Sequence, residues 1–344
     1  MMGANRPKQV SQRSIAIAAG IGAVTAVGLI VIKADPIKVF VGASVAGLIG
    51  ERSSHHMQGL NAQELIDIGI KKGMSGDFAG AIDEFKKAIA VDPKNAVAYF
   101  YLGNVYNSLN EYDKAISEFT KAIEINPNYA DAYSYRGASK SDLRNFRGAI
   151  EDYDMAIKLD PGNATAYYNR GDSKIGTYNF REAISDFNAS LKIDPNNPDA
   201  LYSRGLSKYK LNDRDGAIQD YQKATQINPN HLDAHLNLAN TIAERGEYKE
   251  AFLIYSKAIE IRPDYELSYF NRGITAAEIK NYPAAISDFE KATELNPRHS
   301  KYHHNLGLAR FYSQDVEGAC KDWKVAAELG NTNSKMLLKK HCSS

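Results

Sequence analysis

The sequence predicts an all-α protein, a solenoid of paired helices, and three periodic features carry this prediction. Prolines recur at a constant spacing of 34 residues, from Pro93 to Pro297. Small residues recur with the same spacing, and so does a large aromatic residue. Such a period indicates one helix-turn-helix unit repeated along the chain, because each unit buries its apolar face against its neighbours.

Each unit is numbered so that its proline is position 32. The eight units then begin at residues 62, 96, 130, 164, 198, 232, 266 and 300. Position 8 is glycine except for Ala239, and position 20 is always alanine, so two helices can approach closely there. Position 24 is always an aromatic ring, which fills the space between helices. The pattern predicts helix A near positions 2 to 14 and helix B near positions 18 to 31, where the proline ends it.

This pattern resembles the tetratricopeptide repeat (TPR) family, whose 34-residue unit has the same arrangement of small residues, ring and proline. The resemblance covers residues 62–333 and implies a right-handed superhelix of eight repeats. The eighth unit has Asn331 at the proline position, and the chain continues into an amphipathic segment. We expect this segment, residues 334–344, to form a capping helix and tail over the exposed end of the stack.

Four units have an arginine at position 7 of helix A, and the same four have an aspartate at position 23. In an antiparallel helix pair joined by a short turn, these two positions face each other. The expected ion pairs are Arg136–Asp152, Arg170–Asp186, Arg204–Asp220 and Arg272–Asp288. Unit six has Leu238 and Ile254 instead, whereas units one, two and eight keep an acid without the arginine. The alternative is that the arginines extend into the concave groove and bind an acidic partner.

The N-terminal segment has the composition of a membrane anchor. After a basic arm, residues 1–14, the stretch 15–32 has no charge, and as a helix it would reach about 27 Å, enough to cross a bilayer. A second apolar run at 37–50 would make residues 15–50 a membrane hairpin, and a linker, 51–61, follows. A single span is our expectation; a cleaved signal peptide and a buried helix are the alternatives. The side of the membrane on which the repeats lie stays open.

Composition and motifs argue against several classes of function. The formal net charge of +1 predicts no binding of nucleic acid, although the charge is uneven, since residues 1–61 hold six Lys and Arg against two Asp and Glu. No nucleophile motif, phosphate loop or carboxylate pair occurs in a supporting context, so we expect neither an enzyme nor a cofactor. His299, His303 and His304 lack an acidic co-ligand, and no metal site is expected. Cys320 and Cys342 are too few for a disulfide framework.

The resemblance implies a binding function for the concave face, which helix A lines with positions 2, 5, 6, 9, 12 and 13. Clamping the carboxylate tail of a chaperone needs lysine at position 5, and no unit has one, so a chaperone tail is not the expected partner. The expected groove consists of Phe100, Tyr101, Asn104, Tyr135, Tyr168, Asn169, Asp172, Tyr202, Tyr209, Asn237, Asn240, Phe270, Asn271 and Asn305.

Rings interleaved with asparagines suit a protein partner with an extended peptide, because amides both donate to and accept from its backbone. Charge is scarce in this set, so we expect weak dependence of binding on salt. The sequence therefore predicts a membrane-anchored interaction scaffold or assembly factor. The alternatives are a structural or regulatory subunit of a membrane-associated complex, and a secreted or periplasmic TPR protein after signal cleavage.

Overall fold

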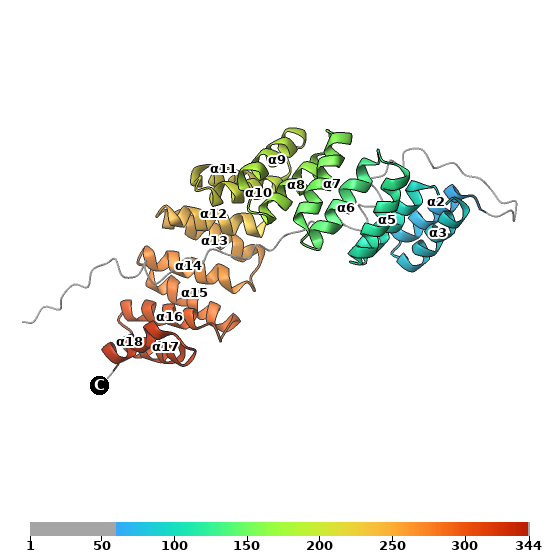
Figure 1. The fold of residues 1–344 in the computed structure, drawn as a ribbon. Coiled ribbons are helices and arrows are strands. Elements are labelled where there is room, and N and C mark those ends of the chain that lie inside the picture. The colour runs from blue at the N-terminus through green and yellow to red at the C-terminus, as the bar shows by residue number, and fades with distance from the viewer. Residues whose placement is uncertain (1–59, 343–344) are drawn as a thin grey trace, which may run out of the picture. The chain divides into compact units, whose positions relative to one another are not determined.

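The computed structural model describes residues 60–342, and all regular elements in this range are α-helices (Figure 1). The helices are α2 (Ala62–Met74), α3 (Phe78–Val91), α4 (Ala96–Ser108), α5 (Tyr112–Ile125), α6 (Ala130–Asp142), α7 (Phe146–Leu159), α8 (Ala164–Gly176), α9 (Phe180–Ile193), α10 (Pro198–Lys210), α11 (Arg214–Ile227), α12 (Leu232–Glu244), α13 (Tyr248–Ile261), α14 (Glu266–Glu278), α15 (Tyr282–Leu295), α16 (Ser300–Tyr312), α17 (Val316–Glu328) and α18 (Thr332–His341). The predicted all-α series of helix pairs is confirmed, with α2 and α3 forming repeat one and α16 and α17 forming repeat eight.

The predicted membrane segment, residues 15–50, lies outside the described residues. None of the helices between residues 60 and 342 combines the length and hydropathy needed to cross a membrane. The chain divides into two compact bodies, of which the first contains α2 to α12 up to Glu244 and the second contains α13 to α18 from Arg245 onward.

Helices A and B each begin one residue earlier than predicted, A at position 1 and B at position 17. In four repeats an asparagine just before helix A caps it; the Asn163 side chain, for example, accepts a hydrogen bond from the Ala166 amide at 2.9 Å. Helix B ends before the proline because the preceding residue is extended, as at Asp92 with φ −133°.

Position 15 turns the chain between helices A and B in the left-handed conformation. Gly76 and Gly246 have φ 83°, but the other six repeats use Asn110, Arg144, Tyr178, Asn212, Lys280 and Gln314, with φ between 59° and 73°. A residue with a Cβ costs about 1 kcal/mol there, and the two packed helices hold it in place. The varied residue types hide this position from a search for periodicity.

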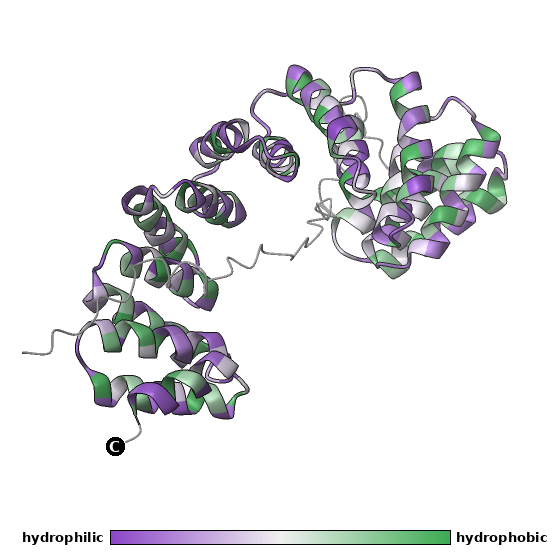
Figure 2. Cartoon of the chain, turned by 60° about the vertical axis from the view of Figure 1, so that its left-hand side comes forward, coloured by the Kyte–Doolittle hydropathy of each residue, from purple (hydrophilic) through white to green (hydrophobic). Residues whose placement is uncertain are grey.

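In the seven repeats that have glycine at position 8, the ring at position 24 lies directly against that glycine. All eight rings are at most 2% exposed: Phe85, Phe119, Tyr153, Phe187, Tyr221, Tyr255, Phe289 and Trp323. A Cβ on Gly171 would lie 2.8 Å from a ring carbon of Phe187, closer than two carbon atoms can pack. Hydrophilic residues alternate with hydrophobic ones around the helices, as expected for elements buried on one side (Figure 2).

The C-terminal helix α18 caps repeat eight, as predicted, although it begins at Thr332 instead of residue 334. The buried Ser334 side chain lies 2.8 Å from the Nδ1 atom of His304, and the His341 ring packs 4.7 Å from the ring of Phe311. These contacts cover an end of the stack that would otherwise expose apolar surface.

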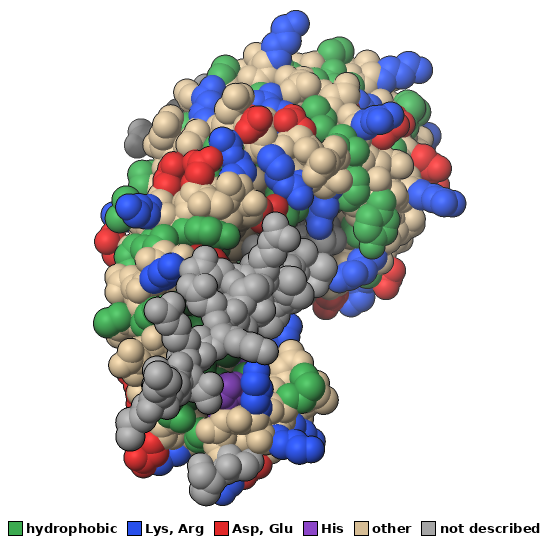
Figure 3. Space-filling view, turned by 90° about the vertical axis from the view of Figure 1, so that its left-hand side faces the viewer, with side chains coloured by type: hydrophobic (Ala, Val, Ile, Leu, Met, Phe, Trp, Pro, Cys, Tyr) green, Lys and Arg blue, Asp and Glu red, His purple; other side chains and the backbone are tan. Residues whose placement is uncertain are grey.

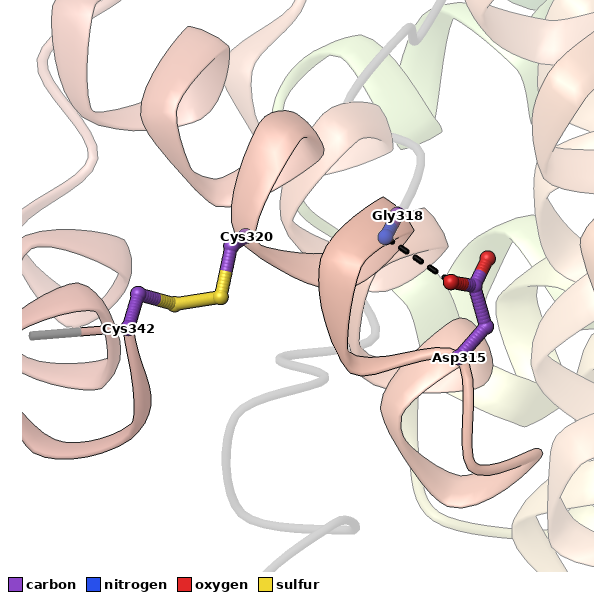
Figure 4. Close-up of a disulfide and its surroundings, with 4 residues drawn as sticks. All are labelled: Asp315, Gly318, Cys320 and Cys342. Atoms are coloured by element: carbon purple, nitrogen blue, oxygen red, sulfur yellow. Dashed lines mark hydrogen bonds between the residues drawn. A yellow bond between two sulfur atoms is a disulfide. The ribbon is translucent and has the colours of Figure 1, made fainter. Parts of the chain in front are cut away.

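A disulfide joins Cys320 of α17 to Cys342 at the end of α18 (Figure 4), with a Cα–Cα distance of 5.8 Å. Asp315 caps α17 nearby by accepting a hydrogen bond from the Gly318 amide at 2.8 Å. Two cysteines do not make a disulfide framework, but a single disulfide can hold the C-terminal helix α18 against α17, which was not predicted from the sequence. Closing a loop of 22 residues restricts the unfolded chain and stabilises the fold by about 3 kcal/mol.

Candidate protein-binding surface

All four expected Arg–Asp pairs are present, and each is bidentate. The arginine Nε lies 2.9 to 3.0 Å from one carboxylate oxygen, and Nη2 lies 2.5 to 2.6 Å from the other. The aspartate side chains are only 4 to 5% exposed. The guanidinium groups therefore bind within their own repeats, as the structural hypothesis requires, and are not directed at an acidic partner.

The remaining donor of each arginine, Nη1, makes a hydrogen bond to the side chain at position 25 of the preceding repeat. Nη1 of Arg170 donates to Asp154 at 2.6 Å, and Nη1 of Arg204 donates to Asn188 at 2.7 Å. Thr120 and Ser256 accept in the same way from Arg136 and Arg272. The arginines thus link neighbouring repeats, which the sequence analysis missed. The signal in the sequence was a short polar residue that can accept a hydrogen bond. It stands at position 25 of the repeat that precedes each repeat with an arginine at position 7.

A basic residue at position 11 explains two of the three acids that have no arginine at position 7, and the third, Glu118, lies 3.1 Å from Lys121 of its own helix. In repeat one, Lys72 lies 2.7 Å from Glu84. In repeat eight, Arg310 lies 2.7 Å from Asp322. Repeats three, four and five have both cations, because Lys140, Lys174 and Lys208 add a contact of 2.7 to 2.8 Å to the same aspartates.

The structure corrects the groove assignment for the aromatic residues. Phe100, Tyr101, Asn104 and Tyr168 are at most 6% exposed. The rings at position 5 pack against the position 24 ring of their own repeat; the centroid distances are 5.8 Å for Phe100–Phe119, 5.9 Å for Tyr168–Phe187, 5.9 Å for Tyr202–Tyr221 and 5.8 Å for Phe270–Phe289. These rings belong to the core, because each packs on the ring of its own repeat and Phe100 also packs 5.3 Å from the ring of Tyr135 in the next repeat.

Several other expected groove residues bind within the chain. The Tyr209 hydroxyl donates to Glu244, and the guanidinium of Arg214 lies 3.9 Å from the Tyr209 ring centroid. Asn237 donates to the Tyr202 hydroxyl at 3.0 Å. Asn305 donates to the Lys301 carbonyl at 2.8 Å, and Asn240 and Asn271 are half-buried with partners of their own.

Two expected residues keep the character of a binding surface, Asn169 and Asp172, whereas the Tyr135 ring packs 5.3 Å from the ring of Phe100. Among residues 60–342, no hydrogen bond or ion pair satisfies the Asp172 carboxylate, and burial raises its pKa to about 7. Asn169 lies three residues earlier on α8, so the two side chains share a helix face. Burial, followed by the nearby Asp131 carboxylate, raises the pKa of Tyr135 to about 12.

The concave positions of the first body carry more acid than the sequence analysis recognised. Positions 2, 6, 9 and 13 of repeats one to six hold one basic residue, Lys210, and seven acids: Asp67, Asp131, Asp142, Asp172, Asp199, Asp233 and Glu244. After burial itself, the carboxylates of Asp172 and Asp199 raise the pKa of Tyr168. The weak dependence of binding on salt was expected because the residues assigned to the groove carry little charge. The face as a whole carries these acids, so that expectation loses its basis.

On the face shown in Figure 3, the Lys and Arg side chains are interspersed with Asp and Glu, so they form no continuous basic band there. Within residues 60–342, no three His, Cys, Asp or Glu side chains come together as metal ligands. The expected groove positions among the described residues thus offer carboxylates, amides and phenols to a partner.

Models of the tetratricopeptide repeat match most of the repeat region. The matched residues are 75–109, 96–129, 145–174, 164–197, 198–231, 220–252 and 267–299. The chain belongs to the tetratricopeptide repeat family. TPR proteins are generally scaffolds for protein–protein interaction, and this chain is such a scaffold.

Solved TPR structures share the fold of this chain. The C-terminal part of a TPR repeat-containing protein from Cytophaga hutchinsonii is 20% identical, with a TM-score of 0.58, over 71% of this chain and 98% of that one. PilF from Pseudomonas aeruginosa is 22% identical, with a TM-score of 0.54, over 60% and 94%. YrrB, described as a TPR protein with an unusual peptide-binding site, is 30% identical, with a TM-score of 0.49, over 54% and 96%. No curated protein matches the chain.

Proposed function

We propose that this TPR protein binds an extended segment of a protein partner on the concave face of its A helices, with Asn169 and Asp172 of α8 in contact with that segment. The observation that carries the proposal is the half-buried Asp172 carboxylate, which has no hydrogen-bond or ion-pair partner among residues 60–342. By contrast, every aspartate at position 23 that faces an arginine is bidentately paired, as Asp186 is with Arg170.

An ionised carboxylate is costly in partly desolvated surroundings unless a cation or donors satisfy it. Its charge is felt by the phenols of Tyr153, Tyr168 and Tyr202, whose pKa values burial already raises. A lysine or arginine of the partner would supply the missing charge. The Asn169 amide would bind the backbone of the same segment, since it offers two donors and one acceptor.

The variant Asp172→Asn is expected to stabilise the fold and weaken binding. The folded pKa of Asp172, about 7, exceeds the unfolded value, so ionisation opposes folding and stability falls as pH rises through this interval. At pH 8 the variant should therefore gain about 1 to 3 kcal/mol in free energy of unfolding, and below pH 4 it should gain nothing. Affinity for peptides selected from a displayed random library should fall about tenfold.

The matched control is Glu151→Gln on α7, a helix B, where the carboxylate is exposed. We expect no change in stability or affinity there. If Asp172→Asn binds the selected peptides as tightly as the unchanged chain, the contact assignment is wrong. If the full chain selects no peptide at all, the proposed function itself fails.

The proposed function also includes a membrane anchor formed by residues 15–32, supported by their eighteen uncharged positions. The Cys320–Cys342 disulfide supports a location of the repeats in an oxidising compartment. A single span with its basic arm in the cytoplasm would place them across the membrane, whereas a hairpin would not.

Carbonate extraction of native membranes, followed by thiol alkylation, tests the anchor and its sidedness. We expect the protein to stay in the pellet and its cysteines to react only after reduction. Release into the supernatant would exclude a spanning helix. Alkylation without reductant in freshly isolated membranes would place the repeats in a reducing compartment.

A further inference from the structure

A small cavity that opens to solvent lies among α14, α15 and α16 of the second body. Its apolar walls include Ile274 and Ala277 from α14, Phe289 from α15, and Leu308 and Ala309 from α16. The apolar walls suit contact with the aliphatic stem of a long side chain that lies along the open side of the cavity.

Two tyrosine rings complete the wall of this cavity. Tyr282 at the start of α15 and Tyr312 at the end of α16 stack with a centroid distance of 5.8 Å and an interplanar angle of 15°. Tyrosine faces attract cations through the negative charge of the ring face. The lining therefore combines aliphatic contact with a surface that favours a positive group.

Glu278, the last residue of α14, is the one charged residue of the lining. Among residues 60–342 its carboxylate has neither a hydrogen bond nor an ion pair, although it is half-buried. Burial raises its pKa, and its own charge contributes to the raised pKa of Tyr248 and Tyr282. A carboxylate in this position lacks the cation that would offset its desolvation.

The first body shows how the same framework binds a cation. Glu244 also stands at position 13 of its repeat, and Arg214, at position 17 of the repeat before it, donates from Nε to Glu244 at 3.0 Å. The Arg214 guanidinium also lies over the ring of Tyr209, 3.9 Å from its centroid. For Glu278 the corresponding residue of the preceding repeat is Tyr248, so the chain supplies an acid and rings but no cation.

We propose that the cavity among α14, α15 and α16 binds a lysine or arginine side chain of a partner protein. The aliphatic stem lies between the apolar walls, and the cationic end lies beside Glu278 and the tyrosine faces. Arginine is preferred over lysine because its planar group can stack on a ring while it donates to the carboxylate. The inference rests on the proposed binding of an extended segment and adds a second, charge-specific contact in the second body.

The test uses peptides selected from a displayed random library on the full chain in detergent. Selected peptides should be enriched in arginine or lysine, and replacement of one such residue by the uncharged isostere citrulline or by norleucine should weaken binding about tenfold, which corresponds to about 1.4 kcal/mol. Glu278→Gln should weaken the basic peptide to the same extent and should leave the substituted peptide unchanged. Glu250→Gln, at an exposed carboxylate of α13, is the matched control and should change neither.

The outcomes separate this inference from the function on which it rests. Selected peptides that bind equally well to Glu278→Gln overturn the cavity assignment and leave the groove on α8 standing. Peptides that bind tightly without any basic residue overturn both the cavity assignment and the contact at Asp172. A library that yields no binder overturns both. A loss of binding in Glu278→Gln that affects the basic and the neutral peptide equally would show that the substitution disturbs the fold, and the assignment would fall.

Discussion

Replacing Arg272 by methionine is expected to lower the free energy of unfolding of the second body by about 3 to 5 kcal/mol. Asp288 is 3% exposed, and Arg272 is the cation that binds it. Methionine retains most of the arginine stem, so the loss reports the uncompensated carboxylate more than missing volume. The equivalent change Arg136→Met should cost only about 1 to 2 kcal/mol, since Lys140 remains 2.8 Å from Asp152.

The double variant Arg272→Met with Asp288→Leu is the control. Replacing both partners by apolar residues removes the buried charge, so most of the stability should return. Repeat six, with Leu238 and Ile254 at these positions, is a natural precedent. Urea denaturation, with hydrogen exchange of α14 and α15 as the local readout, measures the effect. Equal losses for Arg272→Met and Arg136→Met would contradict the account.

Truncating a position 24 ring, as in Tyr221→Ala, is expected to destabilise the first body by about 3 to 5 kcal/mol. The ring is 1% exposed, and it fills the space over Gly205, where a Cβ would lie 2.8 Å from a ring carbon. Because each repeat is stabilised by its neighbours, the cavity weakens the interfaces on both sides.

Tyr178→Ala is the matched control for this ring, because Tyr178 is 81% exposed on a turn. Its truncation should change stability by less than about 0.5 kcal/mol. Thermal denaturation of the two variants side by side gives the comparison. Similar shifts in both would mean that the rings at position 24 do not form the core.

The repeat, its core and the Arg–Asp pairs could be predicted because they follow from residue types at fixed positions. Gly171 and Phe187 meet in the structure for the same reason that they recur in the sequence: only a small residue leaves room for the ring. The ion pairs followed from the correlated presence of arginine and aspartate. Features that place the same residue type at the same position of every repeat can therefore be predicted without a structure.

The remaining features depend on which neighbours a side chain packs against and on contacts between residues that are far apart in the sequence. Position 5 rings such as Phe100 were assigned to the groove because helix A carries them, but they pack against the position 24 ring of helix B in the same repeat. The left-handed turn at Tyr178 is imposed by the helices on either side and leaves no mark on residue type. The contact between Cys320 and Cys342 needs α18 to fold back onto α17, which spacing alone does not show.

Site-specific photo-crosslinking tests the central claim most directly. A photoreactive amino acid is placed at Asn169 on the concave side of α8, or in a second sample at the exposed Glu151 on α7, in full-length protein in the cells that make it. We expect the probe at Asn169 to crosslink one contiguous segment of a partner protein that contains lysine or arginine, and the probe at Glu151 to give no such product. Crosslinks that are equal at both positions, or that occur at Glu151 alone, would contradict binding on the concave face.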